Sequence, residues 1–517
     1  MIEKEITRRQ MIKGSSLAAL TLFSSSLVND KESNTESNEI NSNIVESSDD
    51  ICFMNAVDMA VLLRTKKLSA REVMKAHLKQ IANINSKVNA LVTLVPEDQL
   101  MTQALAADEL IATGKSTGSL HGLPLAVKDL RETKDIRTTY GSPLYKDYIP
   151  KEDDLIVKRQ KNSGAIVIGK SNVPELGLGS QTFNPIFGPT LNPYDLSKTC
   201  GGSTGGGAVA LACGMVPLAD GSDTGGSLRN PASFCNVVGL RTSPGRVPIP
   251  NARLAWGILS VQGPMARTVS DCSLLLSAQA GPDNRSPLSI MENPEQFLKP
   301  LARNFKGVKI AFIKDFGLPW ETEVIESVKA QWKVFESLGC IVEEAEPDMT
   351  DANECFDNFR HWQTEVQYGD LSEESKEKLN DYARWHITEG RKLTGPYLSR
   401  LEAKRSALYR RVQKFLEKYE YLILPVSQVL PFNINTPYPT KINGVEMLTY
   451  IDWMRSSYYI SVVGNPALSV PCAFSKSGLP IGLQIVGRYN ADFSVLQMGF
   501  AFEQATNLGK QRPKVVH

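Results

Sequence analysis

The chain contains Lys198-Thr-Cys-Gly-Gly-Ser-Thr-Gly-Gly-Gly207, and a second glycine-rich stretch follows it, Asp220-Gly-Ser-Asp-Thr-Gly-Gly-Ser-Leu-Arg229. Each stretch places one serine among glycines, Ser203 in the first and Ser227 in the second. Glycine lets the backbone adopt φ > 0 and approach a ligand closely. Acyl transfer needs a nucleophile beside preorganised N–H groups, because charge develops on the reacting carbonyl oxygen. The two stretches therefore predict a serine-dependent acyl-transfer site.

A candidate base lies upstream of both serines. The apolar run over residues 123–127 predicts a buried strand that ends at Lys128. Burial disfavours the charged form of a lysine, and a neutral amine can accept a proton from a serine hydroxyl. The alternative is a lysine at a sheet edge with a solvated ammonium group.

Several segments together resemble the amidase signature family. They are Val127-Lys128-Asp129, Gly169-Lys-Ser-Asn-Val-Pro-Glu-Leu-Gly177, the two serine stretches with their continuation through residue 247, Asn465-Pro-Ala-Leu-Ser-Val-Pro471 and Gly478-Leu-Pro-Ile-Gly-Leu-Gln-Ile-Val-Gly487. The resemblance runs from about residue 55 to about residue 505. The segment over residues 450–460 is similar to the branch of small-amide and cyclic-oligoamide hydrolases. The resemblance implies an α/β fold with a central mixed β-sheet covered by helices on both faces.

The resemblance also implies a role for each candidate residue. Ser227 would be the nucleophile, Lys128 the base, and Ser203 a bridging serine that follows a cis Gly202–Ser203 peptide bond. Such a site would hydrolyse a carboxylic amide C–N bond through an acyl-enzyme, with no metal or organic cofactor. The substrate would be a small-molecule amide.

Further residues are expected to support this chemistry. The backbone N–H groups expected to form an oxyanion hole are those of Thr224, Gly225, Gly226 and Ser227. Asp223 and Arg229 are expected to hold the nucleophile loop through buried ion-pair or hydrogen-bond contacts. Two positions depart from the family pattern: Thr204 stands where a second serine is usual, and Gly207 where a serine or other small residue is common. We expect these departures to affect substrate fit more than activity.

Other functions are compatible with parts of the same pattern. Gly201-Gly-Ser-Thr-Gly205 fits the nucleophile elbow of an α/β-hydrolase-type esterase using Ser203, but a turn-rich segment precedes it instead of a strand. The five histidines (His77, His121, His361, His386 and His517) lie in segments that do not suggest a base. An ammonia-releasing amidotransferase subunit shares the family signature, and a non-catalytic amide-binding module is a third alternative.

The N-terminal region predicts an export signal followed by a spacer. Paired arginines, Arg8 and Arg9, precede a short apolar stretch, so residues 1–28 resemble a twin-arginine signal, and an amphipathic helix is the alternative. Residues 29–50 carry seven acidic residues against one lysine and predict a disordered Ser/Asn-rich spacer. Residues 51–517 would form a single catalytic domain with a helical insertion at about 371–419. The predicted location is the periplasm, and the cytoplasm is the alternative.

Composition argues against several partners. The 57 basic and 56 acidic residues leave no charge excess for nucleic acid, and no later stretch predicts stable membrane insertion. The eight cysteines contain no C-x-x-C pair, which argues against a metal site. The oligomeric state is left open, and a homodimer is compatible with the sequence.

Local signals predict an alternation of helices and strands. Ser69 and Glu72 form a capping-box pattern that opens a helix running to about Asn85. A strand is expected over residues 91–95, then a helix over 96–113, and Thr268 is expected to cap another helix. Further strands are expected over residues 165–168, 308–313 and 421–424.

Overall fold

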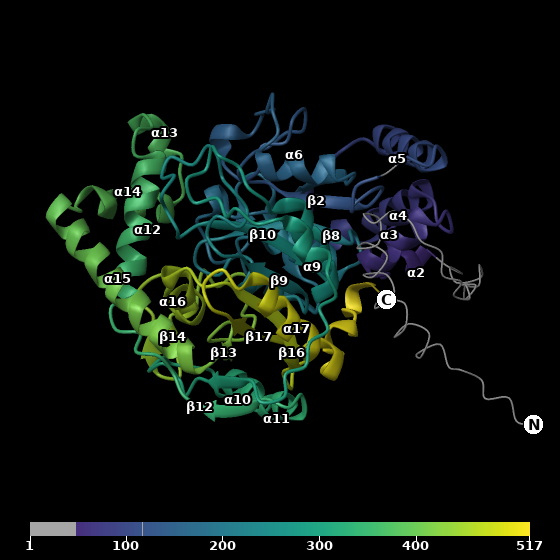
Figure 1. Cartoon of the computed structure of the whole chain (residues 1–517). Helices are drawn as coiled ribbons and strands as arrows, with labels where there is room; N and C mark the ends of the chain where they lie inside the picture. Colours follow the sequence, from purple (N-terminus) through teal and green to yellow (C-terminus); the bar gives the residue numbers. More distant parts are fainter. Residues whose placement is uncertain (1–47, 116, 517) are drawn as a thin grey trace, which may run out of the picture.

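A single 11-stranded sheet forms the centre of the protein in the computed structural model, which describes residues 48–115 and 117–516 (Figure 1). Its strands are, in spatial order, β1 (Leu91–Leu94), β3 (Ile166–Ser171), β2 (Pro124–Lys128), β8 (Leu218–Asp223), β10 (Val261–Ala266), β9 (Val238–Arg241), β16 (Ala467–Phe474), β17 (Pro480–Val486), β13 (Tyr421–Pro425), β11 (Lys309–Phe312) and β12 (Ile341–Glu344). The predicted export signal and residues 29–47 of the predicted spacer lie outside the described residues. Helix α2 (Ser48–Cys52) includes the last three residues of that spacer.

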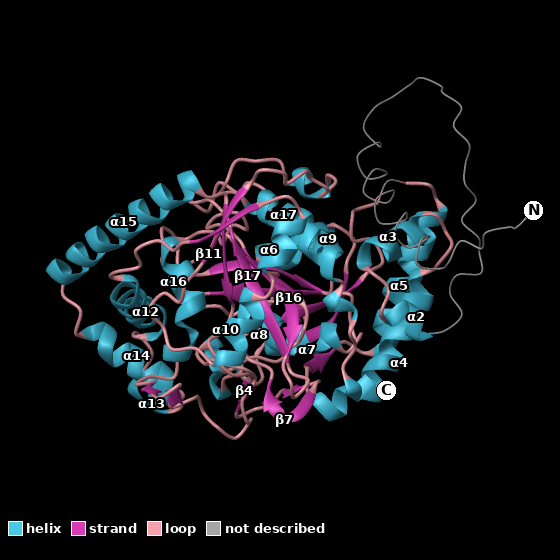
Figure 2. Ribbon diagram, turned by 90° about the horizontal axis from the view of Figure 1, so that it is seen from below, coloured by secondary structure: helices cyan, strands magenta, loops and turns pink. Residues whose placement is uncertain are grey.

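The sheet is mixed. Strand β2 runs parallel to β3 and to β8, and β11 runs parallel to β12 and to β13. The other pairings in this sheet are antiparallel. Helices surround the strands in the view of Figure 2. The predicted α/β fold with a mixed central sheet is confirmed.

Helices and short hairpins account for the other regular structure. The α-helices after α2 are α3 (Ala56–Arg64), α4 (Ala70–Val88), α5 (Glu97–Ala112), α6 (Leu155–Asn162), α7 (Gly205–Ala212), α8 (Arg229–Phe234), α9 (Val269–Gln279), α10 (Thr322–Lys329), α11 (Trp332–Ser337), α12 (Ala352–Tyr368), α13 (Glu373–Glu377), α14 (Asp381–Arg391), α15 (Gly395–Lys418), α16 (Arg455–Val463) and α17 (Asp492–Thr506). The short strands outside the main sheet are β4 (Phe183–Asn184), β5 (Gly188–Pro189), β6 (Leu191–Asn192), β7 (Asp195–Thr199), β14 (Lys441–Ile442) and β15 (Val445–Glu446).

The local signals in the sequence correspond to observed elements. Ser69 and Glu72 form the capping box of α4, which extends to Val88, and the Thr268 side chain caps α9 by accepting from the N–H of Asp271. Three helices, α13, α14 and α15, occupy residues 373–418. Together with α12 they lie on the opposite side of the molecule from α2, α3, α4 and α5 (Figures 1 and 2).

The parallel pairing of β2 with β8 positions the candidate site. Every residue of β2 is buried, as expected for a parallel strand covered on both faces. Leu125 of β2 pairs with Leu218 of β8, so both strands run toward the same sheet edge. Lys128 ends β2 and Asp223 ends β8. The base and the nucleophile loop therefore leave the sheet at neighbouring carboxyl ends, where ligands bind in open α/β sheets.

Three further features of the described part of the chain concern membrane crossing, metal binding and disulfide bonds. None of its helices combines the length and the apolar character needed to cross a membrane. No group of three or more His, Cys, Asp or Glu side chains there is arranged to hold a metal ion. The eight cysteines are all buried, and no disulfide joins any two of them.

Candidate active site

Lys128 is held at the end of β2 by its own backbone. Its N–H donates to Oδ1 of Asp220 on the neighbouring strand β8, at 2.8 Å. The Lys128 side chain is fully buried, with 0% of its surface exposed. The alternative of a solvated lysine at a sheet edge is therefore wrong.

The Lys128 amine lies among hydroxyl groups. Its Nζ is 2.8 Å from Oγ of Ser203, 2.7 Å from Oγ1 of Thr204 and 3.1 Å from Oγ of Ser222. We expected Thr204 to be a supporting residue of the site and its departure from the family pattern to concern substrate fit; its hydroxyl contacts the candidate base directly. Sequence reasoning missed Ser222, although it lies inside the second glycine-rich stretch.

The surroundings of the amine favour its neutral form. Burial lowers the pKa of Lys128 well below its ordinary value, and the nearby Arg131 guanidinium lowers it further. The carboxylates of Asp223 and Asp220 oppose this shift without overcoming it. Lys128 therefore has the low pKa that a serine-activating amine requires.

The two serine loops are joined through their backbones. The N–H of Thr204 donates to the carbonyl of Ser227 at 3.2 Å, so the residue after Ser203 lies against the candidate nucleophile. The Gly202–Ser203 peptide bond is cis. Ser203 and Ser227 are 3% and 8% exposed, so little of either side chain reaches solvent.

Gly201 allows this close approach of the loops. Its φ is +75°, and a β-carbon there would lie 2.3 Å from Oδ1 of Asn230. That same oxygen accepts a hydrogen bond from the N–H of Gly202 at 3.1 Å. A side chain at position 201 would therefore displace the group that holds the first serine loop.

A buried ion-pair network holds the second loop. Asp223 lies 3.0 Å from Nη2 of Arg229 and 3.0 Å from Nη1 of Arg241, and all three side chains are fully buried. Burial alone would raise the pKa of Asp223, but the two guanidinium groups outweigh it and hold the pKa far below its usual range. Arg229 also donates to Oε1 of Gln484 on β17 at 2.9 Å. Asp223 and Arg229 thus make the expected kind of contact, and Arg241 was missed because it lies on β9, distant in sequence.

The expected oxyanion donors are not equivalent. The N–H of Gly226 donates to Oδ1 of Asp223 at 2.9 Å, which turns it away from a substrate oxygen and corrects our expectation for this residue. Within residues 48–115 and 117–516, the N–H groups of Thr224, Gly225 and Ser227 donate no hydrogen bond to the protein. Three of the four expected donors are therefore free for a ligand.

The arrangement argues against a serine–histidine site. No histidine among the described residues hydrogen-bonds Ser203 or Ser227; the partners of His77 and His121 are the backbone carbonyls of Gly214 and Ala107. Strand β7, which precedes Ser203, belongs to a two-stranded sheet with β6 and not to the main sheet. The nucleophile elbow of an α/β-hydrolase requires both a histidine partner and a central strand, so this alternative is wrong.

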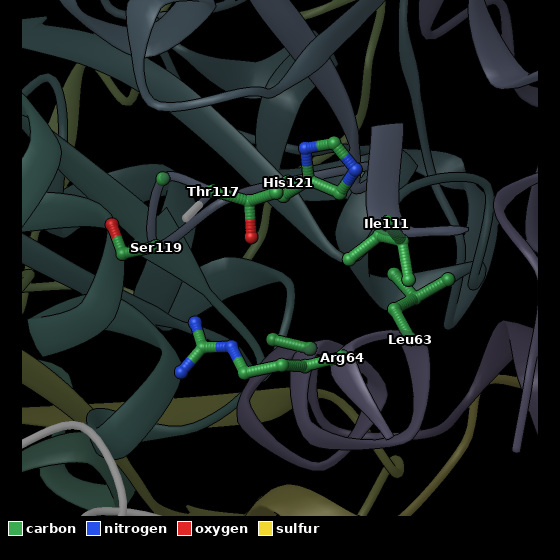
Figure 3. Close-up of a pocket in the computed structure, with 8 residues that line it drawn as sticks. Leu63, Arg64, Ile111, Thr117, Ser119 and His121 are labelled. Carbon is green, nitrogen blue, oxygen red and sulfur yellow. The ribbon is translucent and has the colours of Figure 1, made fainter. Parts of the chain in front are cut away.

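A separate small pocket is shown in Figure 3. Its lining residues are Ala60, Leu63, Arg64, Ile111, Thr117, Gly118, Ser119 and His121. None of the candidate catalytic residues lines it, so we do not connect it with the serine loops.

Comparison with known proteins agrees with this geometry. The family model described as Amidase matches residues 72–496. The chain belongs to the amidase family. Membership makes it an amidase-signature enzyme, and the resemblance noted from the serine motifs is confirmed.

Relatives of this chain include an amidotransferase subunit and an acylamidase. A glutamyl-tRNA(Gln) amidotransferase subunit of Alkaliphilus metalliredigens is 34% identical over 480 residues, covering 87% of this chain and 96% of the relative. An acylamidase of Rhodococcus erythropolis is 30% identical over 470 residues, covering 89% and 97%. Among solved structures, a bacterial aryl acylamidase of the amidase signature family superposes with a TM-score of 0.83 at 27% identity, covering 89% of this chain and 99% of that one. The 6-aminohexanoate cyclic dimer hydrolase, at 23% identity and a TM-score of 0.78, covers 90% of this chain and 99% of its own and shares the fold.

We expect Asp223→Asn to destabilise the protein by about 3–5 kcal/mol, because it leaves two buried guanidinium groups without their carboxylate. The pKa of Asp223 is depressed in the folded protein. Its stabilising contribution is therefore present above the ordinary aspartate pKa of about 4 and is lost as pH falls through the folded value. Urea unfolding at neutral pH measures the loss. The matched control is Asp147→Asn, whose carboxylate is 80% exposed and 3.9 Å from Lys146. Equal unfolding midpoints for the two variants would contradict the role given to Asp223.

Proposed function

We propose that this protein hydrolyses a carboxylic amide C–N bond through an acyl-enzyme on Ser227, with a proton relay formed by Lys128 and Ser203. The observation that carries the proposal is the fully buried Lys128 amine, 2.8 Å from Oγ of Ser203. No metal or organic cofactor enters the reaction as we propose it.

The hydrogen bonds around Lys128 define the starting proton positions. A neutral amine has one lone pair and two N–H donors. Thr204 and Ser222 supply hydroxyl oxygens at 2.7 Å and 3.1 Å that can accept those two protons. The lone pair then accepts the Ser203 hydroxyl proton at 2.8 Å, which leaves Oγ of Ser203 able to accept a proton in turn. Ser203 is thereby prepared to deprotonate Ser227.

The reaction proceeds in two halves. In the first, Ser227 attacks the amide carbonyl, Ser203 takes its proton, and Lys128 receives the proton that Ser203 gives up. The ammonium returns a proton through Ser203 to the leaving nitrogen, and the C–N bond breaks. In the second half, water attacks the acyl-enzyme with the same relay, which releases the carboxylic acid and restores Ser227.

Backbone donors stabilise the tetrahedral intermediates. The N–H groups of Thr224, Gly225 and Ser227 are the proposed oxyanion hole, because they have no other partner in the described part of the chain. Loss of one such donor costs about 3–4 kcal/mol of transition-state stabilisation in comparable sites. Asp223 positions this loop through Arg229, Arg241 and the N–H of Gly226.

A panel of primary, aryl and cyclic amides tests the proposal. Released amine or ammonia is measured, and a fluorophosphonate probe reports the reactive serine independently of the substrate. Labelling at Ser227 together with turnover of at least one amide class is the expected result. A protein that neither labels nor hydrolyses any amide would rule the proposal out.

A second candidate function is that of an ammonia-releasing amidotransferase subunit. The observation that favours it is the 34% identity to the glutamyl-tRNA(Gln) amidotransferase relative. The test is glutaminase activity together with copurification of a partner subunit. Amide hydrolysis by the isolated chain, without a partner, favours the stand-alone amidase.

We propose a single catalytic domain over residues 51–517. For the location, we propose export to the periplasm, with the cytoplasm as the alternative. A homodimer is compatible with this function. The support for export is the arginine pair at residues 8 and 9, which lies outside the described residues.

We expect Arg8→Lys combined with Arg9→Lys to retain the protein in the cytoplasm, because a twin-arginine signal is read through the arginine pair. Cell fractionation followed by detection of the full chain measures the distribution. Lys13→Arg, which leaves the pair intact, is the control and should be exported like the wild type. Unchanged periplasmic recovery of the double variant would contradict the predicted signal.

A further inference from the structure

One face of α12 lies over the nucleophile loop. A β-carbon at Gly225 would be 2.8 Å from Cζ of Phe356, so this ring contacts the loop directly. Two turns later, Nε2 of Gln363 donates to Oγ of Ser260 at 2.7 Å. That hydroxyl is 2.7 Å from Oγ1 of Thr224, another loop residue. Position i of the helix therefore contacts the loop that carries Ser227, and position i+7 reaches that loop through Ser260.

Arg360 lies between those two contacts on the same helical face, at position i+4. A second segment, which carries Tyr450, also contacts Arg360. Its Nη2 donates to the hydroxyl of Tyr450 at 3.1 Å, and the Tyr450 carbonyl accepts from Oγ of Ser180 at 2.9 Å. The next residue, Gln181, packs its backbone against Gly202, where a β-carbon would lie 3.0 Å away. Arg360 is thus enclosed by two segments that contact the two serine loops.

The Arg360 side chain is buried without an ionic partner. It is 7% exposed, and within residues 48–115 and 117–516 it forms no ion pair with a carboxylate. The carboxyl group nearest in sequence is Asp357, one turn earlier on α12; burial and the neighbouring Asp452 raise its pKa to about 7, and Arg455 and Arg360 oppose this shift without overcoming it. A buried charge without an ion-pair partner is costly, and an anionic ligand that pairs with Arg360 would offset that cost.

The hydrogen-bond partners of Arg360 are uncharged and fix its position. Its Nε donates to Nε2 of His386 at 3.3 Å, so that nitrogen is the acceptor and the proton of His386 lies on Nδ1. His386 Nδ1 can then donate to Nδ1 of His361, 2.8 Å away. Burial lowers the pKa of His361 to about 4 and that of His386 well below its usual value, so both rings are neutral at pH 7. The cluster orients the guanidinium without neutralising it.

We propose that Arg360 binds a carboxylate of the substrate, so that the preferred amides are anionic. The inference rests on the proposed amidase function and names its substrate class. A planar guanidinium matches a carboxylate with two parallel N–H···O bonds, which Lys cannot reproduce. His386 and Tyr450 act as positioning residues, because they accept hydrogen bonds from Nε and Nη2 of Arg360 and so orient the guanidinium. The carboxylate lies either on the acyl part or on the leaving amine, and the two sources call for different substrates.

The test compares anilides that differ by one charge. The acyl arm uses the mono-anilide of glutaric acid, and the amine arm uses the 4-carboxyanilide of butyric acid. Each is paired with the same compound carrying a methyl ketone in place of the carboxylate, because a carboxamide would itself be an amide substrate. In one arm the wild type should prefer the carboxylate by on the order of 10- to 100-fold in kcat/KM, as charge-assisted hydrogen bonds predict. Arg360→Gln should bring that ratio close to one through KM, and Arg360→Lys should retain part of it.

Controls separate this inference from folding and from the proposed function. Arg253→Gln removes an exposed guanidinium that contacts the same helix at Val366, and it should keep the wild-type ratio. Fluorophosphonate labelling reports an intact site in each variant. If Arg360→Gln does not label, Tyr450→Phe carries the test, because it keeps the charge and removes one group that positions it, so the ratio must fall.

Two outcomes would overturn the inference. One is a wild type that labels and hydrolyses anilides but prefers the carboxylate in neither arm. The other is an unchanged ratio in a labelled Arg360→Gln protein, or in Tyr450→Phe where that variant carries the test. A wild type that neither labels nor hydrolyses any amide would instead remove the proposed amidase function.

Discussion

Ser227→Ala is expected to abolish amide turnover while leaving the fold intact. The substitution removes the only atom that we assign to attack on the carbonyl, and nucleophile loss in serine hydrolases lowers kcat on the order of 10⁶-fold. The fold should persist because no hydrogen bond from the Ser227 hydroxyl to another described residue is present, so no buried partner is left unpaired. The measurements are hydrolysis of the best amide, labelling by the fluorophosphonate probe, and the thermal midpoint.

A matched control for this variant is Ser273→Ala. Ser273 is fully buried on α9, and its hydroxyl donates to the carbonyl of Phe297 at 2.6 Å. This control should lose some stability and keep its kcat/KM. Ser227→Ala should keep its stability and lose its kcat/KM. Retained labelling in Ser227→Ala would assign the nucleophile to another serine and would overturn the proposed mechanism.

Lys128→Ala is expected to lower kcat/KM by about 10²–10⁴-fold, the usual contribution of a general base. The pH profile carries the sharper information. Only the neutral amine accepts the Ser203 proton, so the wild-type rate should fall as pH falls through the depressed pKa of Lys128. The variant has no such amine, and its residual rate should lack this acidic limb.

Lys170→Met distinguishes the two buried lysines of this region. Burial lowers the pKa of Lys170 to about 8, but its Nζ donates to Oγ1 of Thr133 and Oγ1 of Thr138 and to neither serine. This variant should therefore keep the acidic limb. If the fall in rate at low pH disappears in Lys170→Met and persists in Lys128→Ala, the titrating amine is Lys170. That result would contradict the proposed relay.

Local sequence signals predicted the parts of the site that a single segment determines. The apolar run before Lys128 predicts a buried strand, and that strand is β2. The glycines around Ser203 and Ser227 predict tight loops, and Gly201 and Gly226 do adopt positive φ. In each case the reason lies within a few residues, so periodicity and glycine chemistry were sufficient.

The rest of the site depends on contacts between distant segments. Arg241 reaches Asp223 from β9, and nothing in its local sequence indicates a partner on β8. The N–H of Gly226 was expected to face the substrate, but it donates to the Asp223 carboxylate, which Arg241 on the distant strand β9 holds in place. The contact of Thr204 with Lys128 likewise joins residues 76 positions apart. Spacing along the chain does not determine which of several polar neighbours is nearest in space.

Helices α12, α13, α14 and α15 are inserted between β12 and β13, whereas Lys128 ends β2 and Ser227 follows β8. The proposed relay residues and the helices that flank them thus belong to separate stretches of the chain. The two stretches come together at Phe356, and also at Gln363 through Ser260. Under our proposal for Arg360, substitutions in α12 or α14 change which amides are accepted and leave the buried amine in place. Replacing this helical segment alone is a route by which relatives with dissimilar substrates can evolve from one ancestral catalytic frame.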